Sequence, residues 1–285
     1  MAKAVAKKAE KGGLPAEFEA ELLEDAGEFE EHLQQADMAI PFLQVIQAQS
    51  PQVTEGDAQF IKEAVKGMLF NTVTKKCYDG REEGVMIVPI KYKRSFIEWV
   101  RREDGGGFVA EHPPEESGNL HTKLNEDRQD IIQEGSRLGV PGHQIVETAT
   151  HFVMLIDPET GDGTPCVLSM SSSQFKVSRN WNSQIATRVV QTSKGKVKPP
   201  RFFDAWRLKT VVLTNDEGTW YGYDLQNEGT THDTFESGAE IYEACKTFSR
   251  SLKSGEKKAD YSKAPGNGGN EAAGGDPDKD DEIPF

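Results

Sequence analysis

The apolar residues of this chain are gathered into short strand-forming segments in its middle, whereas both ends are polar. The segments richest in strand formers are Met68–Thr74, Gly84–Tyr92, Gln144–Ile156, Pro165–Met170, Arg201–Thr214 and Gly218–Leu225. Turn residues separate them, and Asn215–Gly218 is typical of a hairpin turn, while Pro89 indicates an edge strand or a bulge. Two other segments, Ser173–Gln191 and Thr234–Leu252, carry apolar residues at helical spacing. The middle of the chain is therefore predicted to be an α+β structure that is mainly β, with added helices.

Both ends of the chain have compositions that do not build a core. Residues 1–40 carry a net charge of −6, and glutamate and aspartate dominate there. Residues 255–285 carry a net charge of −4 and include a glycine-rich sequence of low complexity. We therefore expect an acidic, partly disordered arm over 1–38, a folded domain over 39–254, and a disordered linker with an acidic tip over 255–285.

The charge of the chain is unevenly distributed. The 285 residues carry a formal net charge of −14, yet Ser171–Thr214 holds nine basic residues and one acidic residue, Asp204. A basic region in an acidic protein predicts a binding site for a polyanion. A solvated basic face without a ligand is the alternative interpretation.

The sequence lacks the signatures of membrane, metal and nucleotide-hydrolysing proteins. No apolar run approaches the roughly 20 residues needed to cross a bilayer, which excludes a membrane-spanning protein. The three cysteines, Cys77, Cys166 and Cys245, are far apart and odd in number, which favours a reducing compartment, the cytoplasm. Zinc-ligand spacings, a phosphate-binding loop and a nucleophile elbow are all missing. We therefore predict no metal, no cofactor and no catalytic residues.

The sequence printed for the C-terminus combines negative charge with an apolar end. Acidic residues precede Ile283 and Pro284, and the last residue is Phe285. The acids would attract a basic surface, the phenyl ring could fill an apolar pocket, and an arginine could hold the terminal carboxylate. A solvated end without a partner is the alternative.

This ending resembles the C-terminal tip of bacterial and phage single-stranded-DNA-binding proteins (SSBs), which is acidic, ends in Ile-Pro-Phe and follows a Gly/Pro-rich linker. Two departures are mild: Glu282 stands where the family usually has Asp, and Lys279 interrupts the acids. The rest of the chain lacks the bacterial family's N-terminal strand pattern, so the resemblance implies a divergent, phage-encoded member acting in the host cytoplasm. It also implies an OB-fold-like, partly open barrel. The residues to which it assigns partner binding are Asp280, Asp281, Glu282, Ile283, Pro284 and Phe285.

The resemblance further implies partners and regulation. Single-stranded DNA would be bound without strong sequence preference during replication, recombination and repair. The tip would recruit replication or recombination proteins such as a polymerase, helicase, primase or nuclease. It would also fold back to compete with DNA. Oligomeric state is left open, with a homo-oligomer among the alternatives.

Binding single strands without sequence preference needs cations for the backbone and aromatic rings for the bases. If Arg201–Thr214 is a strand, alternation places cations and an aromatic on one face and core residues such as Trp206 and Val212 on the other. The residues of the first face are Arg201, Phe203, Arg207 and Lys209. A neighbouring loop that could clamp phosphates contributes Lys194, Lys196 and Lys198.

A second candidate is Lys91–Arg102, where cations alternate with aromatic side chains. Its predicted DNA-binding residues are Lys91, Lys93, Arg94, Phe96 and Arg101. An amphipathic strand that buries Phe96 and Trp99 is the alternative. Further candidates are Lys176 and Arg179, on the polar side of the first helix, and Tyr221 on the hairpin.

The leading hypothesis is therefore an SSB with no enzymatic activity. A nucleic-acid-processing enzyme, such as a nuclease or annealing recombinase with a borrowed tip, is the second. An acidic interaction or virion protein is the third.

Overall fold

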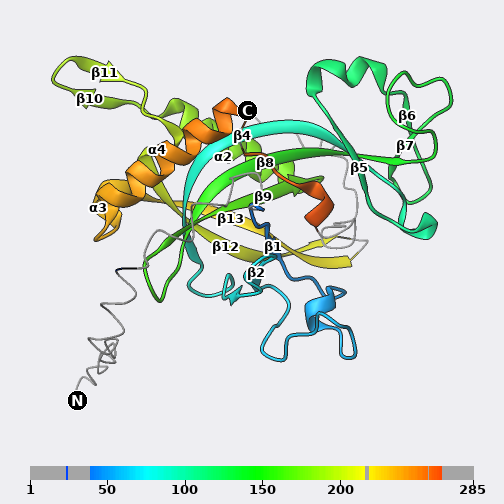
Figure 1. Cartoon of the computed structure of the whole chain (residues 1–285), viewed down its shortest axis with the longest axis horizontal. Helices are drawn as coiled ribbons and strands as arrows, with labels where there is room; N and C mark the ends of the chain where they lie inside the picture. Colours follow the sequence, from blue (N-terminus) through cyan, green and yellow to red (C-terminus); the bar gives the residue numbers. More distant parts are fainter. Residues whose placement is uncertain (1–23, 25–38, 216–217, 256, 265–285) are drawn as a thin grey trace, which may run out of the picture. The chain divides into compact units, whose positions relative to one another are not determined.

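A computed structural model describes residue 24 and residues 39–215, 218–255 and 257–264 (Figure 1). Two units separate by their contacts, Met1–Met38 and Ala39–Phe285. The strands and helices from residue 39 onward belong to the second unit. The expected acidic arm and the expected tip at Asp280–Phe285 lie outside the described residues.

The described chain is mainly β. Its strands are β1 (Leu43–Val45), β2 (Leu69–Asn71), β3 (Cys77–Tyr78), β4 (Val85–Trp99), β5 (Phe108–His112), β6 (Thr122–Leu124), β7 (Asp130–Ile132), β8 (Gln144–Ile156), β9 (Gly163–Ser171), β10 (Val190–Thr192), β11 (Gly195–Val197), β12 (Asp204–Asn215) and β13 (Gly218–Thr230). Its helices are α2 (Gln174–Thr187), α3 (Thr231–Thr234) and α4 (Gly238–Ser254). The 3₁₀ helices are η3 (Pro51–Val53), η4 (Arg102–Asp104), η5 (Pro114–Asn119), η6 (Arg201–Phe203) and η7 (Tyr261–Lys263).

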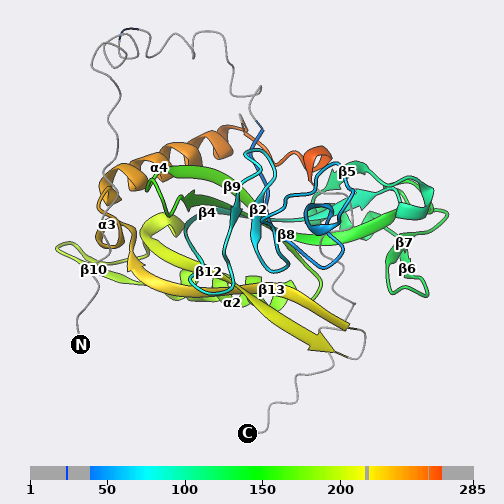
Figure 2. The same cartoon turned by 90° about the horizontal axis from the view of Figure 1, so that it is seen from below.

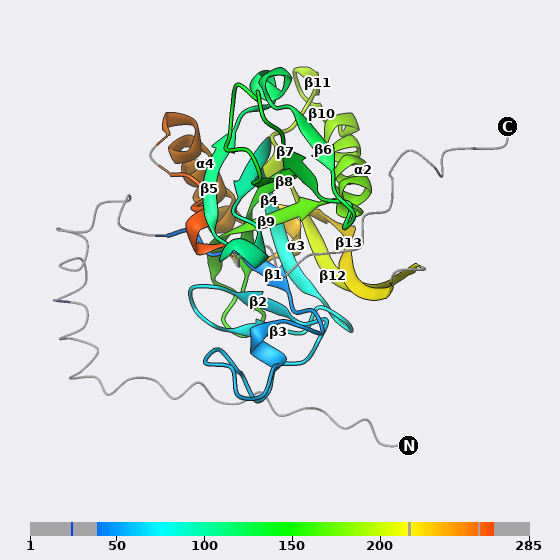
Figure 3. The same cartoon turned by 90° about the vertical axis from the view of Figure 1, so that its right-hand side faces the viewer.

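An eight-stranded antiparallel sheet organises the unit. Its strands run β13-β12-β4-β8-β7-β6, with β5 added to β4 and β9 added to β8. The small sheet β1-β2-β3 and the β10–β11 hairpin lie apart from each other, as Figure 3 shows. The mainly β fold with added helices is confirmed. The large sheet is open and not a closed barrel, and an OB-fold stays a prediction.

Helices cover both faces of the large sheet. On one face, Ile90 of β4 and Phe152 of β8 pack in one core with Cys245 of α4. On the other, β-sheet residues including Trp206 pack with Trp181 of α2. Figure 2 shows α4 and α2 on opposite sides of the strands. Cys245 therefore has the packing role that its place in the apolar stripe predicts.

A β-bulge in β4 determines on which face of the sheet Lys91 and Lys93 lie. The register of β4 against β8 shifts between Pro89 and Lys91, so the bulge expected at Pro89 is present. Val88 before the shift and Ile97 after it belong to the same core, which includes residues of α4. Because side chains alternate along a strand, an extra residue reverses the parity of all that follow. The bulge therefore turns Lys91 and Lys93 toward the α4 face.

Some predicted elements are confirmed and others need correction. The strand Gln144–Ile156 is found with the same bounds. The predicted strand Gly84–Tyr92 continues to Trp99 as β4, so most of the basic segment Lys91–Arg102 forms part of the same strand. Trp99 is buried, as the alternative interpretation expected.

The predicted strand Arg201–Thr214 is wrong at its start and in the core position it gave to Val212, although its end at Thr214 lies within one residue of the end of β12. Arg201 and Phe203 lie in η6, because β12 begins only at Asp204, so they do not share a strand face with Arg207. At the other end, the side chain of Val212 is 57% exposed, since the hairpin extends beyond the core there. Trp206 is buried as predicted.

Candidate nucleic-acid interface

The edge of β4 is only partly paired. On the side away from β8, β12 pairs with Val85–Ile87 and β5 pairs with Phe96–Trp99. In the part of the chain that the structure describes, no strand pairs with Lys91–Ser95 on that side. The sheet therefore has a gap in the middle of its longest strand.

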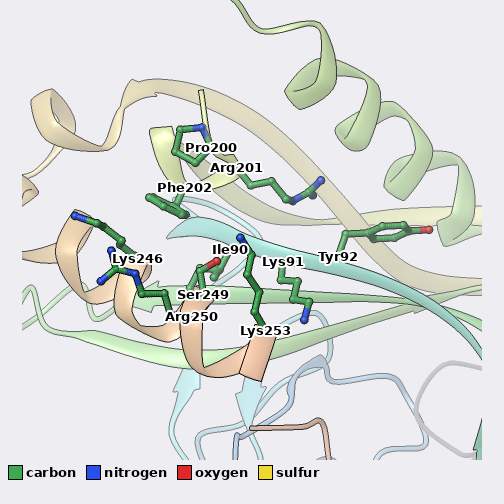
Figure 4. Close-up of a pocket in the computed structure, with 10 residues that line it drawn as sticks. All are labelled: Ile90, Lys91, Tyr92, Pro200, Arg201, Phe202, Lys246, Ser249, Arg250 and Lys253. Carbon is green, nitrogen blue, oxygen red and sulfur yellow. The ribbon is translucent and has the colours of Figure 1, made fainter. Parts of the chain in front are cut away.

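This gap is bordered by η6 and α4 and forms a pocket of about 560 Å³ (Figure 4). Five cations line it, from three separate elements: Lys91, Arg201, Lys246, Arg250 and Lys253. None of the described residues that line it is acidic. In a protein with a net charge of −14, such a concentration of positive charge is typical of an anion site.

The register of α4 brings its cations to the pocket. Lys246, Arg250 and Lys253 are spaced four and three residues apart, so they share one side of the helix. The apolar stripe that includes Cys245 and Phe248 faces the sheet. Packing of that stripe therefore fixes the cationic side at the border of the gap.

Arg201 is the most enclosed cation of the pocket. Its Nη2 donates to Asn182 Oδ1 at 2.9 Å, and its guanidinium lies 5.9 Å from the centre of the Tyr92 ring. Its Nε is buried and has no hydrogen-bond partner among the described residues. Burial lowers the pKa of Arg201 to about 10. The structure thus holds a charged guanidinium in place without a carboxylate to neutralise it.

A stack of aromatic rings packs against this guanidinium. The Tyr92 ring lies 5.0 Å from the His151 ring, which is stacked 4.6 Å from the Trp181 ring. His151 is fully buried, and its Nε2 lies 2.7 Å from Ser178 Oγ. Burial, and then the positive charge of Arg201, lowers the pKa of His151 to about 3. The neutral stack gives Arg201 a rigid support.

Lys91 connects this pocket to a second one. Its Nζ donates to the carbonyl oxygen of Leu252 at 2.7 Å, and burial, then Lys93 and Lys253, lowers its pKa. The second pocket has a volume of about 190 Å³, and Lys91 also lines it. Its other cations are Lys93, Lys257 and Lys258. We call the two pockets together the basic trough.

Charge in the trough is partly compensated, because Lys246 Nζ lies 2.8 Å from Glu243 Oε1 on the same helix. Among the described residues lining it, Glu111 is the only carboxylate, and it lies 2.7 Å from Lys93. The cations of the trough are Lys91, Lys93, Arg201, Lys246, Arg250, Lys253, Lys257 and Lys258.

The structure brings together only three of the DNA-binding residues predicted from the sequence, Lys91, Lys93 and Arg201. Three others form ion pairs elsewhere: Arg94 with Glu147, Arg101 with Glu103 and Asp104, and Arg207 with Glu228. Such pairs are exposed and weak, yet each neutralises the cation locally.

The remaining predicted residues lie outside the trough. Lys176 and Arg179 are exposed on α2, and the three predicted clamp lysines are exposed on or beside the β10–β11 hairpin: Lys194, Lys196 and Lys198. Four more are half-buried: Phe96, Phe203, Lys209 and Tyr221. The guanidinium of Arg188 lies 5.7 Å from the Phe203 ring, so one face of that ring is already covered.

Sequence reasoning missed five cations of the trough, Lys246, Arg250, Lys253, Lys257 and Lys258. The spacing of the α4 cations was a usable signal, because it places three positive charges beside the apolar stripe of one helix. The proximity of these cations to β4 could not be predicted from the sequence, because it depends on where β12 and β5 stop pairing with β4.

A buried carboxylate lies at the other end of β4. Glu98 is 1% exposed and accepts from Val140 N–H at 2.9 Å, and its oxygens lie 2.8 Å from His112 Nε2 and 2.7 Å from His143 Nδ1. Burial alone would raise the pKa of Glu98, but the hydrogen bonds from His112, Val140 and His143 outweigh it and lower that pKa. The cluster joins β5 and the β7–β8 loop to β4.

The described residues contain neither a cluster that could hold a metal ion nor a helix that could span a membrane. No group of three or more histidine, cysteine, aspartate or glutamate side chains there is arranged to hold a metal ion. None of the described helices combines the length and apolar composition that crossing a bilayer requires.

Comparison with known proteins gives one family. A family model described as Pam3 phage gp34-like protein matches residues 9–258, which is most of the chain. No curated protein matches the chain significantly. No solved structure matches it significantly either. The family description names a phage protein and states no activity, and the extent of the match shows that this chain belongs to the Pam3 phage gp34-like protein family.

Proposed function

We propose that this chain binds single-stranded nucleic acid in the basic trough, as a phage SSB. The observation that carries the proposal is the trough itself, where eight cations meet and Glu111 is the only carboxylate among the described lining residues. Neutralising phosphates with lysine and arginine is the main source of sequence-independent affinity for nucleic acids.

The form of the trough favours a single strand. Its two pockets lie side by side along β4 and α4, and Lys91 lines both, so a linear chain of phosphates could run through them. The Tyr92 ring is already covered by Arg201 and His151, so the proposal rests on phosphate neutralisation and not on base stacking.

The acidic segment Asp280–Phe285 adds a second argument, which rests on resemblance. Its likeness to the SSB tip supports recruitment of replication or recombination proteins. An OB-like arrangement of the sheet is part of the same proposal and is argued from the resemblance alone.

A binding titration with matched variants tests the proposal. Anisotropy of a labelled dT20 oligonucleotide should report saturable binding by the full chain at low salt, and unlabelled duplex should compete poorly. The trough variant is K246A/R250A/K253A, and the control variant K62A/K66A/K123A removes the same charge from exposed lysines elsewhere. The trough variant should bind much more weakly, while the control variant should bind almost as the wild type does.

Two outcomes would assign the chain to another class. Metal-dependent shortening of the oligonucleotide would indicate a nuclease. Absence of binding at 50 mM salt would reject the proposal and favour an interaction or virion protein.

A further inference from the structure

The β10–β11 hairpin is a two-stranded ribbon that is separate from the large sheet. Figures 1 and 2 show it projecting from the helices and strands around it. Its strand and turn residues are exposed, apart from Val190 and Gly195, which are half-buried. The ribbon therefore adds little to the core, and its side chains are accessible to a partner.

Contacts at both ends hold the ribbon in place. At its base, Arg188 Nε donates to Asp204 Oδ2 at 3.0 Å, which joins the chain entering the ribbon to the first residue of β12. At its tip, Thr192 Oγ1 donates to the carbonyl oxygen of Gly195 at 2.8 Å. Gly195 has a φ of +112°, a conformation that glycine adopts without strain. The ribbon is thus a positioned element of the structure.

The register gives the ribbon a basic face. Val190 and Val197 lie opposite each other on the two strands. Because side chains alternate along a strand, Lys196 points to the face away from Val197. Lys194 in the turn and Lys198 after the strand are each two residues from Lys196, a spacing that favours the same face.

The charge of these three lysines is not neutralised by the described part of the chain. None of them lies within ion-pair distance of a carboxylate among the described residues. The sequence contains no aspartate or glutamate from Ser171 to Phe203. A basic surface of this kind, in a protein with a net charge of −14, favours a polyanion as its partner.

The shape of the ribbon favours a double helix over a single strand. Proteins that bind single strands place the backbone in a groove of their own surface, whereas this ribbon projects from the surface. A projecting element fits the reverse arrangement, in which the nucleic acid supplies the groove. The major groove of B-form DNA is about 12 Å wide and admits a two-stranded β-ribbon. Lysines on such a ribbon can then reach the phosphates that border the groove.

The ribbon is also close to the basic trough along the chain. Val197 ends β11, and Pro200 and Arg201, only a few residues later, line the larger pocket. The residue before Pro200 is Pro199, and proline fixes φ near −65°, so this connection is stiff. Nucleic acid that leaves the larger pocket on this side would therefore meet the ribbon.

We propose that the β10–β11 ribbon binds the backbone of a DNA duplex that flanks the single strand in the trough. The protein would then prefer junctions between single-stranded and double-stranded DNA. This preference rests on the proposed function, because it requires a strand in the trough, whereas duplex binding by the ribbon does not. A duplex on the ribbon lies outside the trough, which agrees with weak competition by duplex for dT20.

Anisotropy of three labelled DNAs tests the inference: dT20, a blunt duplex, and that duplex with a dT20 tail at its 5′ or 3′ end. The full chain should bind at least one tailed duplex about tenfold more tightly than dT20, because two linked contacts reinforce each other. It should bind the blunt duplex weakly, with a slope of log K against log salt of about −3, as three lysine–phosphate contacts predict.

Three variants locate the contact. K194A/K196A/K198A changes only exposed side chains, and it should lose the advantage of the tailed duplex and the binding of the blunt duplex while keeping its affinity for dT20. K194R/K196R/K198R preserves the charge and should keep all three activities. The control variant K62A/K66A/K123A removes the same charge elsewhere and should also keep them.

The outcomes separate this inference from the proposed function. Equal affinity for dT20 and the tailed duplexes, with no binding of the blunt duplex, would overturn the inference and leave single-strand binding intact. Ribbon-dependent binding of the blunt duplex without any binding of dT20 would support the inference for the ribbon and reject the SSB proposal.

Three further results would overturn the inference. An advantage of the tailed duplex that survives in K194A/K196A/K198A would place the duplex elsewhere. An equal loss of affinity for dT20 and for the tailed duplex in that variant would place the single strand on the ribbon. An equal loss of the advantage in K62A/K66A/K123A would mean that only net charge matters.

Discussion

Removing the three α4 cations of the trough should change how binding depends on salt. The trough contains eight cations, and Lys93 is paired with Glu111 and Lys246 with Glu243, which leaves about six for phosphates. For single strands, log K falls against log salt with a slope of about −0.7 per neutralised phosphate, so the wild type should have a slope of about −4. The trough variant K246A/R250A/K253A should have a slope of about −3, because two of these unpaired cations are lost with Lys246.

These slopes give clear differences in affinity. Raising salt from 50 to 200 mM should weaken wild-type binding roughly 300-fold and binding by the trough variant roughly 50-fold. The assay is anisotropy of labelled dT20 at four or more salt concentrations, with circular dichroism and thermal melts to show that each variant is folded.

The control variant K62A/K66A/K123A makes this prediction specific. It should keep a slope near −4, because its lysines lie outside the trough. An unchanged slope in the trough variant would refute the reasoning, as would an equal loss of slope in both variants, which would mean that only net charge matters.

Three further predictions concern stability and the acidic segment. Glu98→Ala should lower the free energy of unfolding, measured in urea, by about 3 kcal/mol, since it leaves buried donors unpaired. Because the pKa of Glu98 is lowered in the folded state, its contribution to stability is present above about pH 4.5 and is lost as the pH falls. If Glu98→Gln loses stability at acidic pH just as the wild type does, this reasoning is contradicted. Burial lowers the pKa of His151 to about 3, so as the pH falls the unfolded chain takes up this proton before the folded chain does. The free energy of unfolding should therefore fall below about pH 6.5 by up to about 1.4 kcal/mol per pH unit. His151→Phe should lose this dependence, and equal slopes of unfolding free energy against pH in the variant and the wild type would count against it. Deleting Asp276–Phe285 should tighten dT20 binding at low salt if that segment competes for the trough, and identical affinities would exclude such competition.

Local patterns predicted the elements that are surrounded by core. The strand Gln144–Ile156 was found with its bounds because apolar, β-branched residues continue along its whole length. The apolar stripe of α4 was equally readable, and it assigned Cys245 to packing. Pro89 predicted a bulge, because proline has no N–H to donate to the hydrogen-bond ladder between strands.

Long-range pairing decided what local patterns left undetermined. The basic residues from Lys91 onward look like a break in an apolar strand, yet β8 pairs with β4 along both halves. Arg201 and Phe203 alternate as strand residues would, but they form a 3₁₀ turn because β12 pairs with β13 only from Asp204.

The candidate site was only partly predictable for the same reason. Local charge predicted Lys91, Lys93 and Arg201 as binding residues. It predicted Arg94 and Arg207 equally, although carboxylates from other strands neutralise both of them. The trough exists because β12 and β5 leave part of one edge unpaired, and no residue within the gap encodes that fact.

Photo-crosslinking is the most direct measurement of where a strand lies. A dT20 oligonucleotide carrying 5-iodouracil would be irradiated with the full chain, and the crosslinked peptides identified by mass spectrometry. We predict crosslinks to the β4 peptide that carries Lys91 and Lys93 and to residues 246–258, on the two sides of the trough. Crosslinks confined to α2 and the β10–β11 hairpin would contradict the assignment of the trough as the binding site.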